Sequence, residues 1–599
     1  MMKSLMEVKN KINSFKFTDY FQSLKEIQKD VDLSAHKELK VAILRSYTAE
    51  TIEPILKLKL LLEGYNPSFF WGDYNQFSQE ILDERGLLYK FHPDLVILMI
   101  RIEELIPQFV YNFGEFTHDQ WKKDLEKLNR HLTHLVDVLN ERTSAQIILQ
   151  NMALLKEPYW GIFDSQKTNG QLDLLKELNT NLKQAFESRP NAFIWDFDNF
   201  ILRKGSDVIS EPRQWFTSRN PFKQTAYIDI CNDLMRYVLS ALGKGKKCIV
   251  LDLDNTLWGG IIGEDGMAGI ALGHEYPGNC YVEFQRELLK LYHRGIILAL
   301  NSKNNEEDAF EVFDKHPDMV LKRNHIAGYQ INWNDKSSNL HAIASELNIG
   351  IDSMIMIDDN PVECELIRGQ CPQCLVVQLP EKPYLIPSVL SVMPELENIR
   401  LTEEDKNKGK MYQQQLERKN LEKMATNLGD YLTALESSIE IKTVDKFTVP
   451  RVSQLTQKTN QFNMTTRRYT EAEIMQFADS STNHIFSISS KDRFGDNGVV
   501  GVVILKMNGE LAMIDTFLLS CRVIGRTIEQ SIIAFVAEFA KKRGAKKLVG
   551  EFTPTAKNKP AADVYEKMNF QKIDEHNFAL DLEEQILNYS PYVKHEIQI

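Results

Sequence analysis

Two carboxylates follow an apolar stretch near the middle of the chain. The stretch from Cys248 to Gly260 reads CIVLDLDNTLWGG, so Asp252 and Asp254 stand two residues apart. Side chains alternate along a strand with a period of two, so both carboxylates would lie on the same side. One can attack an electrophile while the other transfers a proton, and such a pair also binds a hard cation such as Mg²⁺. Taken alone, the pair is equally compatible with a metal-free turn.

Three later segments supply further residues of this chemistry. Ser302 ends the apolar stretch LALNS, Lys336 opens a predicted helix, and Asp358 and Asp359 end the apolar stretch MIMIDD. In a parallel sheet, ligands bind at the carboxyl ends of the strands. Phosphoryl transfer needs a positioned nucleophile, a cation and Mg²⁺ to offset the charge of the phosphoryl group. The order Asp-x-Asp, Ser, Lys, Asp-Asp therefore predicts a phosphoryl-transfer site.

The elements that would position these residues form one α/β domain over residues 246–395. We expect strands at 247–254, 295–302 and 353–359, connected by helices at 281–294, 305–315 and 337–347. Between Asp254 and Ser302 there is room for a hairpin, one helix and one strand, but not for a large cap domain. An open site does not exclude water by itself, so the substrate is linked to a macromolecule or a neighbouring domain acts as the lid.

The rest of the 599 residues requires further domains, because one hydrophobic core does not extend that far. We predict an α/β multidomain protein. Besides 246–395, its parts are an N-terminal helical segment (1–35), a second α/β domain (36–240), a charged helical connector (396–438) and an α+β domain (439–592). We expect the connector to present a solvated charged face.

Composition limits the partners of the chain. The formal net charge is −12, with 43% hydrophobic and 26% charged residues, which argues against nucleic-acid binding. An anionic ligand would have to meet a local basic patch. Seven cysteines give no disulfide framework, and the N-terminus lacks the apolar run of a signal peptide. We find no apolar stretch long enough to span a membrane, so we expect no membrane association and a cytoplasmic location.

Residues 246–395 resemble the haloacid dehalogenase (HAD) superfamily, whose four motifs carry these residue types in this order. The resemblance implies that Asp252 is the nucleophile and forms an aspartyl-phosphate, while Asp254 is the general acid and base. It implies further that Ser302 hydrogen-bonds the transferring phosphoryl group and that Lys336 offsets its charge.

The same resemblance implies Mg²⁺ as the cofactor. Its ligands would be Asp252, the backbone carbonyl of Asp254, and Asp358, with Asp359 as a further candidate. Carboxylate and carbonyl oxygens are the ligands that Mg²⁺ prefers in proteins.

A closer resemblance is to the FkbH-like proteins, a HAD group. It rests on DLDNTLWGG-x-x-GEDG (252–266) and on six further segments: YPGNCYVEFQ (276–285), NSKNN (301–305), IDDNPVECE (357–365), KTNQFNMTTRRYT (458–470), DRFGDNGVVG (492–501) and SCRVIGR (520–526). Members take 1,3-bisphosphoglycerate, remove phosphate and load the glyceryl group onto an acyl carrier protein. The resemblance implies a phosphorylated C3 substrate and a carrier-protein partner. The alternative is a hydrolytic phosphatase acting on another phosphoester, with the flanking domains binding a partner.

Residues 439–592 resemble the GNAT acyltransferases, which bind the phosphates of acyl-CoA in a loop between a strand and a helix. The corresponding residues are Arg522, Gly525, Arg526 and Thr527, where Thr527 replaces the usual Gly or Ala. Amides at a helix start bind phosphate. The resemblance therefore implies either phosphopantetheine or acyl-CoA as a ligand of this loop.

A glyceryl thioester on the protein would require a cysteine. Cys521 adjoins the phosphate-loop candidate and is the first choice, with Cys280 and Cys364 as alternatives. Residues 36–240 resemble an SGNH-hydrolase fold, in which Ser46 would take the place of the nucleophile. No histidine accompanies it in WDFDNF (195–200), so we expect this domain to be noncatalytic and to act as a carrier-protein dock or lid.

Overall fold

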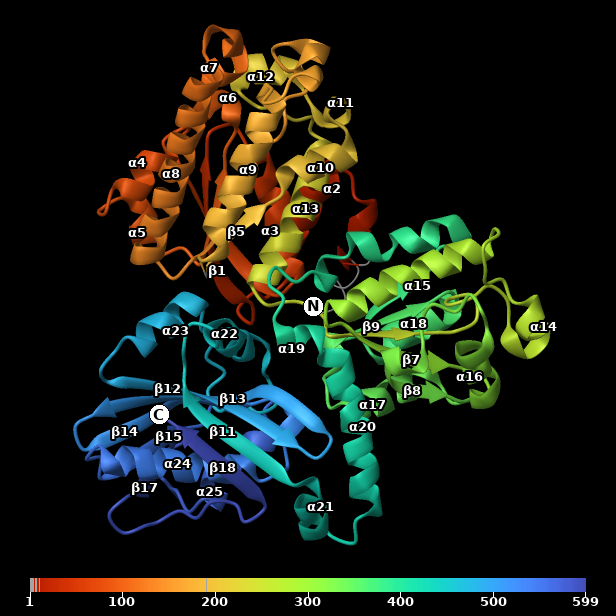
Figure 1. Cartoon of the computed structure of the whole chain (residues 1–599), viewed down its shortest axis with the longest axis vertical. Coiled ribbons are helices and arrows are strands. Elements are labelled where there is room, and N and C mark those ends of the chain that lie inside the picture. Colours follow the sequence, from red (N-terminus) through yellow and green to blue (C-terminus); the bar gives the residue numbers. More distant parts are fainter. Residues whose placement is uncertain (1–4, 6–7, 10, 190) are drawn as a thin grey trace. The chain divides into compact units, whose positions relative to one another are not determined.

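The chain is a mixed α/β multidomain protein. A computed structural model describes all residues except 1–4, 6–7, 10 and 190 (Figure 1). The chain divides into two compact units, Met1–Ala241 and Leu242–Ile599. The first unit contains one sheet and the second contains two. Among the described residues, no helix is long and apolar enough to cross a membrane.

The first unit is built on a five-stranded parallel sheet with the order β2-β1-β3-β4-β5. Its strands are β1 (Lys37–Arg45), β2 (Tyr65–Trp71), β3 (Leu95–Met99), β4 (Gln146–Gln150) and β5 (Ala192–Trp195). Its helices are α2 (Phe17–Asp30), α3 (Glu53–Leu62), α4 (Phe77–Leu82), α5 (Leu87–Phe91), α6 (Ile102–Leu105), α7 (Pro107–Tyr111), α8 (His118–Arg142), α9 (Gln171–Glu187), α10 (Phe197–Lys204), α11 (Ser206–Ile209), α12 (Pro212–Ser218) and α13 (Ala226–Ala241). The crossover helices explain why the strands are parallel and nearly continuously apolar.

The second unit begins with another five-stranded parallel sheet, with the order β10-β9-β6-β7-β8. Its strands are β6 (Cys248–Leu251), β7 (Ile297–Ser302), β8 (Ile326–Ile331), β9 (Met354–Asp358) and β10 (Leu375–Gln378). Its helices are α14 (Ile262–Gly269), α15 (Gly278–His293), α16 (Glu306–Lys315), α17 (Lys336–Leu347) and α18 (Pro361–Gln370). Alternate residues of β6 enter two separate cores, Ile249 and Leu251 on one face and Cys248 and Val250 on the other. The segment from Asp254 to Ser302 contains only the bridges Asp254↔Trp258 and Gly259↔Ala271, α14, α15 and β7, so no large cap domain is inserted there.

The C-terminal sheet has eight strands of mixed direction in the order β16-β17-β15-β14-β13-β12-β11-β18. They are β11 (Ser437–Thr443), β12 (Asn483–Asp492), β13 (Gly495–Asn508), β14 (Leu511–Leu519), β15 (Lys547–Glu551), β16 (Gln571–Lys572), β17 (Asn577–Asp581) and β18 (Val593–Gln598). The helices are α22 (Val449–Lys458), α23 (Glu471–Ala478), α24 (Ile528–Lys542) and α25 (Val564–Lys567). Because β18 pairs with β11, the sheet continues beyond the end at residue 592 that we expected for this domain.

Strands β14 and β15 pair only over their first residues, from Leu511 to Ile514 on β14. Beyond that point the segment Phe462–Met464 adds to the edge of β14. The Met464 amide donates to the Phe517 carbonyl at 3.0 Å, and the Leu519 amide donates to the Phe462 carbonyl at 3.0 Å. On its other side, Met464 accepts a hydrogen bond of 2.8 Å from the Thr553 amide. The chain therefore fills the opening between the two strands with its own segment.

The connector between the two sheets is helical, as expected, but it is not a solvated face. It contains α19 (Glu403–Lys406), α20 (Lys408–Met424) and α21 (Leu428–Leu435). Helix α20 contacts β8 and α17 on one side and β13 on the other. Its Arg418 is fully buried and pairs with Asp492 at 2.7 Å. The prediction failed because the partners of these charged residues lie far away in the sequence.

Candidate active site

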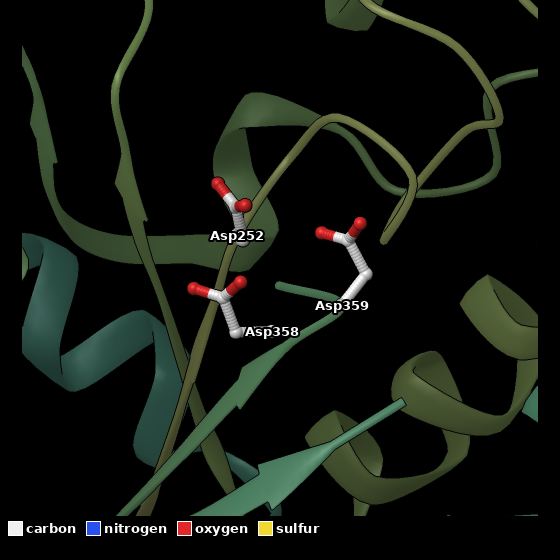
Figure 2. Close-up of side chains that lie close together, drawn as sticks. All are labelled: Asp252, Asp358 and Asp359. Carbon is white, nitrogen blue, oxygen red and sulfur yellow. The ribbon is translucent and has the colours of Figure 1, made fainter. Parts of the chain in front are cut away.

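Three carboxylates lie together at the carboxyl ends of β6 and β9. These strands are hydrogen-bonded neighbours, so Asp252, which follows β6, lies beside Asp358, which ends β9. Carboxylate oxygens of Asp252, Asp358 and Asp359 all lie within 4.8 Å of one another (Figure 2). The prediction that these residues meet at one edge of the sheet is confirmed, while their chemical roles stay predictions.

Lys336 is bound to two of these carboxylates. Its Nζ atom lies 2.8 Å from Asp252 Oδ2 and 2.6 Å from Asp358 Oδ2, and the side chain is buried. Lys336 is the first residue of α17, and its carbonyl accepts a 2.8 Å hydrogen bond from the buried Asn301 amide group. A fixed cation beside the carboxylates can offset the charge of an incoming phosphoryl group.

The Asp254 side chain does not join the three carboxylates. Its Oδ1 accepts hydrogen bonds from Trp258 Nε1 at 2.9 Å and from the Ile262 amide at 3.0 Å. Its Oδ2 accepts one of 3.0 Å from Asn304. The carboxylate is therefore held in one orientation, as a general acid and base requires. The role of the Asp254 backbone carbonyl as a metal ligand stays a prediction.

The Leu-Trp-Gly-Gly sequence after Asp254 builds this arrangement. Trp258 is fully buried and packs edge-on against Phe313. Gly260 has φ +91°, and a Cβ there would lie 2.5 Å from Asp265 Oδ2, so a larger residue does not fit. The tight turn brings the Trp258 indole back to Asp254.

The environment sets the charges of the site. Burial lowers the pKa of Lys336, but the Asp252 and Asp358 carboxylates outweigh it and raise that pKa above its usual range. Burial and then repulsion from Asp252 raise the pKa of Asp358, against the effect of Lys336. Burial also raises the pKa of Asp254, against its hydrogen bonds. An acid with a raised pKa is suited to protonating a leaving group.

The three carboxylates fit a magnesium ion by the chemistry of their donors. They offer hard oxygen ligands, and Lys336 offsets part of their mutual repulsion. Burial, followed by repulsion from Asp252 and Asp358, raises the pKa of Asp359 to about 6. A bound cation would relieve this repulsion.

We expect Mg²⁺ to raise the melting temperature above pH 6 and to lose this effect as the pH falls through that value. Below its pKa the Asp359 carboxyl is neutral, and a proton then competes with the metal. The apparent affinity should fall by about tenfold per pH unit, because one proton is displaced. Thermal unfolding with Mg²⁺ against pH measures this. In Asp359→Asn the affinity should be lower and the pH dependence flatter; an unchanged dependence would contradict the assignment.

Ser302 lies where it was predicted, at the end of β7 beside β6, and it is buried. The sequence reasoning missed three positioning residues, Trp258, Asn301 and Asn304, which hold Asp254 and Lys336. The signal for the two asparagines was their place in NSKNN, directly at the carboxyl end of a strand.

The predicted phosphate loop of the C-terminal domain uses its arginines internally. Arg526 is buried, pairs with Asp492 at 2.9 Å and donates to Gln415 at 2.8 Å. Arg522 is also buried and donates to Ser520 at 3.2 Å. Arg526 therefore compensates the buried charge of Asp492, and Arg522 donates to the Ser520 hydroxyl, so both side chains are engaged within the protein. The predicted phosphate site of this loop now depends on the backbone amides of Gly525 and Thr527. Thr527 directly precedes α24 and has φ +57°.

The candidate cysteines lie in different places. Cys521 is half-buried, its Sγ lies 3.9 Å from the Tyr412 hydroxyl, and its carbonyl accepts a 2.6 Å hydrogen bond from Asn348. Burial raises the pKa of the Cys364 thiol to about 12, which makes it a poor nucleophile. Cys280 is half-buried, and burial raises its pKa as well. Cys521 thus stays the first choice.

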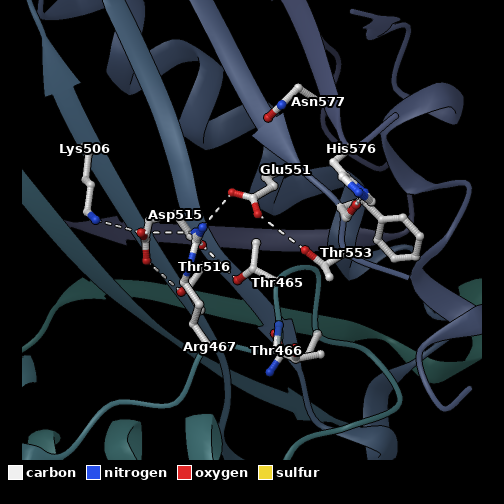
Figure 3. Close-up of polar contacts among 12 residues, drawn as sticks. Thr465, Thr466, Arg467, Lys506, Asp515, Thr516, Glu551, Thr553, His576 and Asn577 are labelled. Carbon is white, nitrogen blue, oxygen red and sulfur yellow. Dashed lines mark hydrogen bonds and ion pairs between the residues drawn. The ribbon is translucent and has the colours of Figure 1, made fainter. Parts of the chain in front are cut away.

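A second polar cluster in the C-terminal domain was not predicted (Figure 3). Buried Asp515 accepts hydrogen bonds from Lys506 at 2.7 Å and from Tyr469 at 2.6 Å, while Arg467 bridges the Asp515 carbonyl and Glu551 at 2.8 and 2.7 Å. Thr466, a β-branched residue, adopts φ +54° beside them. The signal in the sequence was an acid within the apolar strand LAMIDTFLL.

In the first unit, Ser46 is fully buried, and its hydroxyl accepts a 3.0 Å hydrogen bond from the Arg101 amide. A buried serine of this kind serves the structure of the loop after β1. The expectation of a noncatalytic domain stays a prediction.

Comparison with known proteins identifies the family. Residues 40–234 match the family model "FkbH, N-terminal domain". The N-terminal part of the protein BF1531 from Bacteroides fragilis, solved with a phosphatase domain complexed with Mg, is similar at 30% identity and TM-score 0.58. The match covers 65% of this chain and 100% of that chain. The chain therefore belongs to the FkbH-like family.

Weaker likenesses each cover about a quarter of the chain. The spermidine/spermine N-acetyltransferase SpeG from Vibrio cholerae matches 24% of this chain and 95% of its own at 12% identity and TM-score 0.20. The ribosomal-protein-S18-alanine N-acetyltransferase from Escherichia coli matches 24% of this chain and 94% of its own at 13% identity and TM-score 0.20. No curated protein matches the chain.

Proposed function

We propose that the chain is a Mg²⁺-dependent phosphatase of the HAD type that works through an aspartyl-phosphate. The observation that carries this proposal is the position of Lys336 between Asp252 and Asp358, with Asp359 beside them. The Mg-bound phosphatase domain of the Bacteroides relative supports it. Asp252, Asp358 and Asp359 would hold the ion, which would neutralise charge on the phosphoryl oxygens.

The residues then divide the reaction between them. An Asp252 carboxylate oxygen attacks phosphorus, the bond from phosphorus to the leaving oxygen breaks, and Asp254 gives that oxygen its proton. A water then attacks phosphorus while Asp254 takes the proton back. The phosphorus–oxygen bond to Asp252 breaks, which frees inorganic phosphate and restores the carboxylate. Lys336 stabilises the charge of the phosphoryl group throughout.

The Asp254→Asn variant should lower turnover by about 10²–10⁴-fold. With p-nitrophenyl phosphate the leaving group needs no proton, so the first step should continue while the second is slowed. Intact mass spectrometry after brief incubation should therefore show one phosphoryl group on the protein. The double variant Asp252→Asn/Asp254→Asn is the matched control and should carry none; an adduct on it would contradict the assignment of Asp252.

For the substrate we propose a phosphorylated C3 metabolite such as 1,3-bisphosphoglycerate, whose glyceryl unit is loaded onto an acyl carrier protein. Membership of the FkbH-like family and the half-buried Cys521 support this step. A thiolate would attack the C1 carbonyl to form a thioester, and the C1–oxygen bond would break to release inorganic phosphate. The phosphatase site would then hydrolyse the remaining phosphate ester. The C-terminal domain, proposed as GNAT-like, would receive the phosphopantetheine arm or acyl-CoA, and the first unit would dock the carrier protein.

Incubation with 1,3-bisphosphoglycerate and holo acyl carrier protein tests the transfer. Intact masses should show a glyceryl adduct on the carrier protein. They should also show one on the enzyme, and the enzyme adduct should be absent from the Cys521→Ala variant. Carrier-independent phosphate release without any adduct would instead favour the hydrolytic alternative, a phosphatase for another phosphoester.

A further inference from the structure

Four cations gather where the C-terminal domain meets the domain of the carboxylates. They are Lys247 before β6, Lys408 at the start of α20, and Arg451 and Lys458 on α22, and we call them the cationic cluster. Lys247 Nζ donates to the Lys458 carbonyl at 3.1 Å, which joins the two domains. The cluster is unexpected in a chain of net charge −12.

Within the described residues, Asp405 is the one carboxylate that pairs with the cluster. Lys408 Nζ lies 3.5 Å from Asp405 Oδ1, and Gln454 donates to Asp405 Oδ2 at 2.7 Å. Arg451 instead donates to the Val499 carbonyl at 3.4 and 3.3 Å. One carboxylate in a described ion pair therefore faces four cations, while Asp352 attracts Lys247 and Glu404 attracts Arg451 without a described ion pair.

The four side chains act on one another. Burial, together with repulsion from Lys458, Lys247 and Arg451, lowers the pKa of Lys408 to about 7, against the attraction of Asp405. Burial and like charges lower the pKa of Lys247 and Lys458 as well. Like charges held together in a half-buried place destabilise the protein unless an anion joins them.

The lysine ammonium groups of the cluster also have hydrogen-bond donors that their described contacts do not use. An ammonium has three donors. In the described contacts, Lys247 uses one donor, to the Lys458 carbonyl. Lys458 also uses one donor, to Asn398 at 3.5 Å. A phosphate group offers three acceptor oxygens and up to two negative charges, which matches several ammonium donors converging from different elements.

The cluster is separate from the carboxylate site. Lys247 precedes β6 and Asp252 follows it, so the two lie at opposite ends of the same strand. Five residues of extended chain span about 17 Å. Cys521 lies nearby, because it packs against the core that contains Cys248, the residue after Lys247.

We propose that the cationic cluster binds a phosphate group at the junction of the two domains, away from the phosphatase site. The phosphate is either inorganic phosphate or the phosphate of a phosphopantetheine arm. Binding of inorganic phosphate does not depend on the proposed transfer reaction. Binding of a phosphopantetheine arm rests on that reaction and would place the arm near Cys521.

Calorimetric titration of the full chain in EDTA tests the site with three probes: inorganic phosphate, 4′-phosphopantetheine and pantetheine, against sodium chloride at equal ionic strength. We expect both phosphates to bind and pantetheine not to bind. A 4′-phosphopantetheine affinity at least tenfold above that of inorganic phosphate identifies the arm as the ligand, and equal affinities identify free phosphate.

Lys408→Met and Lys458→Met should each weaken phosphate binding at least tenfold. Lys315→Met, an exposed lysine paired with Glu311, is the matched control and should not. In the absence of phosphate, the melting temperature of Lys408→Met should be no lower than that of the unchanged protein, because the substitution removes repulsion among the four cations. Its kcat/KM for p-nitrophenyl phosphate should stay within twofold. Equal phosphate affinity in the Met variants would overturn the proposal, as would a parallel loss of kcat/KM, which would assign the binding to the phosphatase site.

Discussion

Replacement of Asp252 by Asn should lower kcat/KM for phosphoester hydrolysis by at least about 10⁴-fold. The amide cannot form an acyl phosphate, and it removes one of the three carboxylates of the proposed magnesium site. Lys336 keeps its 2.6 Å ion pair with Asp358, so the fold around the site should persist. Phosphate release from p-nitrophenyl phosphate at saturating Mg²⁺ measures the effect.

An Asp→Asn change on the surface provides the control. Asp314 lies on α16, is exposed and pairs with Arg323, so Asp314→Asn should retain full activity. Activity of Asp252→Asn within a factor of ten of the unchanged chain would show that another group is the nucleophile, and the phosphatase proposal in this form would be abandoned.

Replacement of Asp492 by Asn should destabilise the C-terminal domain by about 3–5 kcal/mol. Asp492 is buried between Arg418 and Arg526, which lie 2.7 and 2.9 Å away. Burial acts to raise the pKa of Asp492, but Arg418 and then Arg526 lower it. The variant would leave two guanidinium groups buried without a counter-charge.

Hydrogen exchange is the suitable measurement, because all tryptophans precede residue 334 and report on other domains. Amides of β12 and β13 should exchange about two to four powers of ten faster in Asp492→Asn. The exposed pair Lys442–Glu440 provides the comparison, and Lys442→Met should change stability by less than about 1 kcal/mol. Equal exchange in both variants would show that the buried pair does not stabilise this domain.

The carboxylate site could be predicted because its geometry follows from local patterns. Apolar strands that end in Asp252, Ser302 and Asp358 must converge when the strands are parallel. The hydrogen bonds that orient Asp254 could not be predicted in the same way. They depend on a turn at Gly260 and on Asn304, fifty residues away in the chain.

The predictions for the C-terminal half failed where charges are buried. Arg526 was expected to face a phosphate, and α20 was expected to be solvated, yet Arg526 and Arg418 share Asp492. Nothing local distinguishes a buried arginine from an exposed one, because the burial depends on a partner 34 or 74 residues distant. The sequence pattern predicted the helix α20, but only its tertiary contacts show that Arg418 is buried and paired.

The segment Phe462–Met464 has a consequence for any extended ligand of the C-terminal domain. It occupies the edge of β14 through the same backbone donors and acceptors that an amide-containing arm would use. Such an arm can pair with the edge of β14 only in molecules in which the segment Phe462–Met464 has moved away from that edge. Its apparent affinity is then the intrinsic affinity reduced by the fraction of molecules in that open state. A change that weakens the segment, such as Asn463→Gly, would raise the affinity for such an arm without contacting it, so the segment would act as a competitor of the proposed ligand.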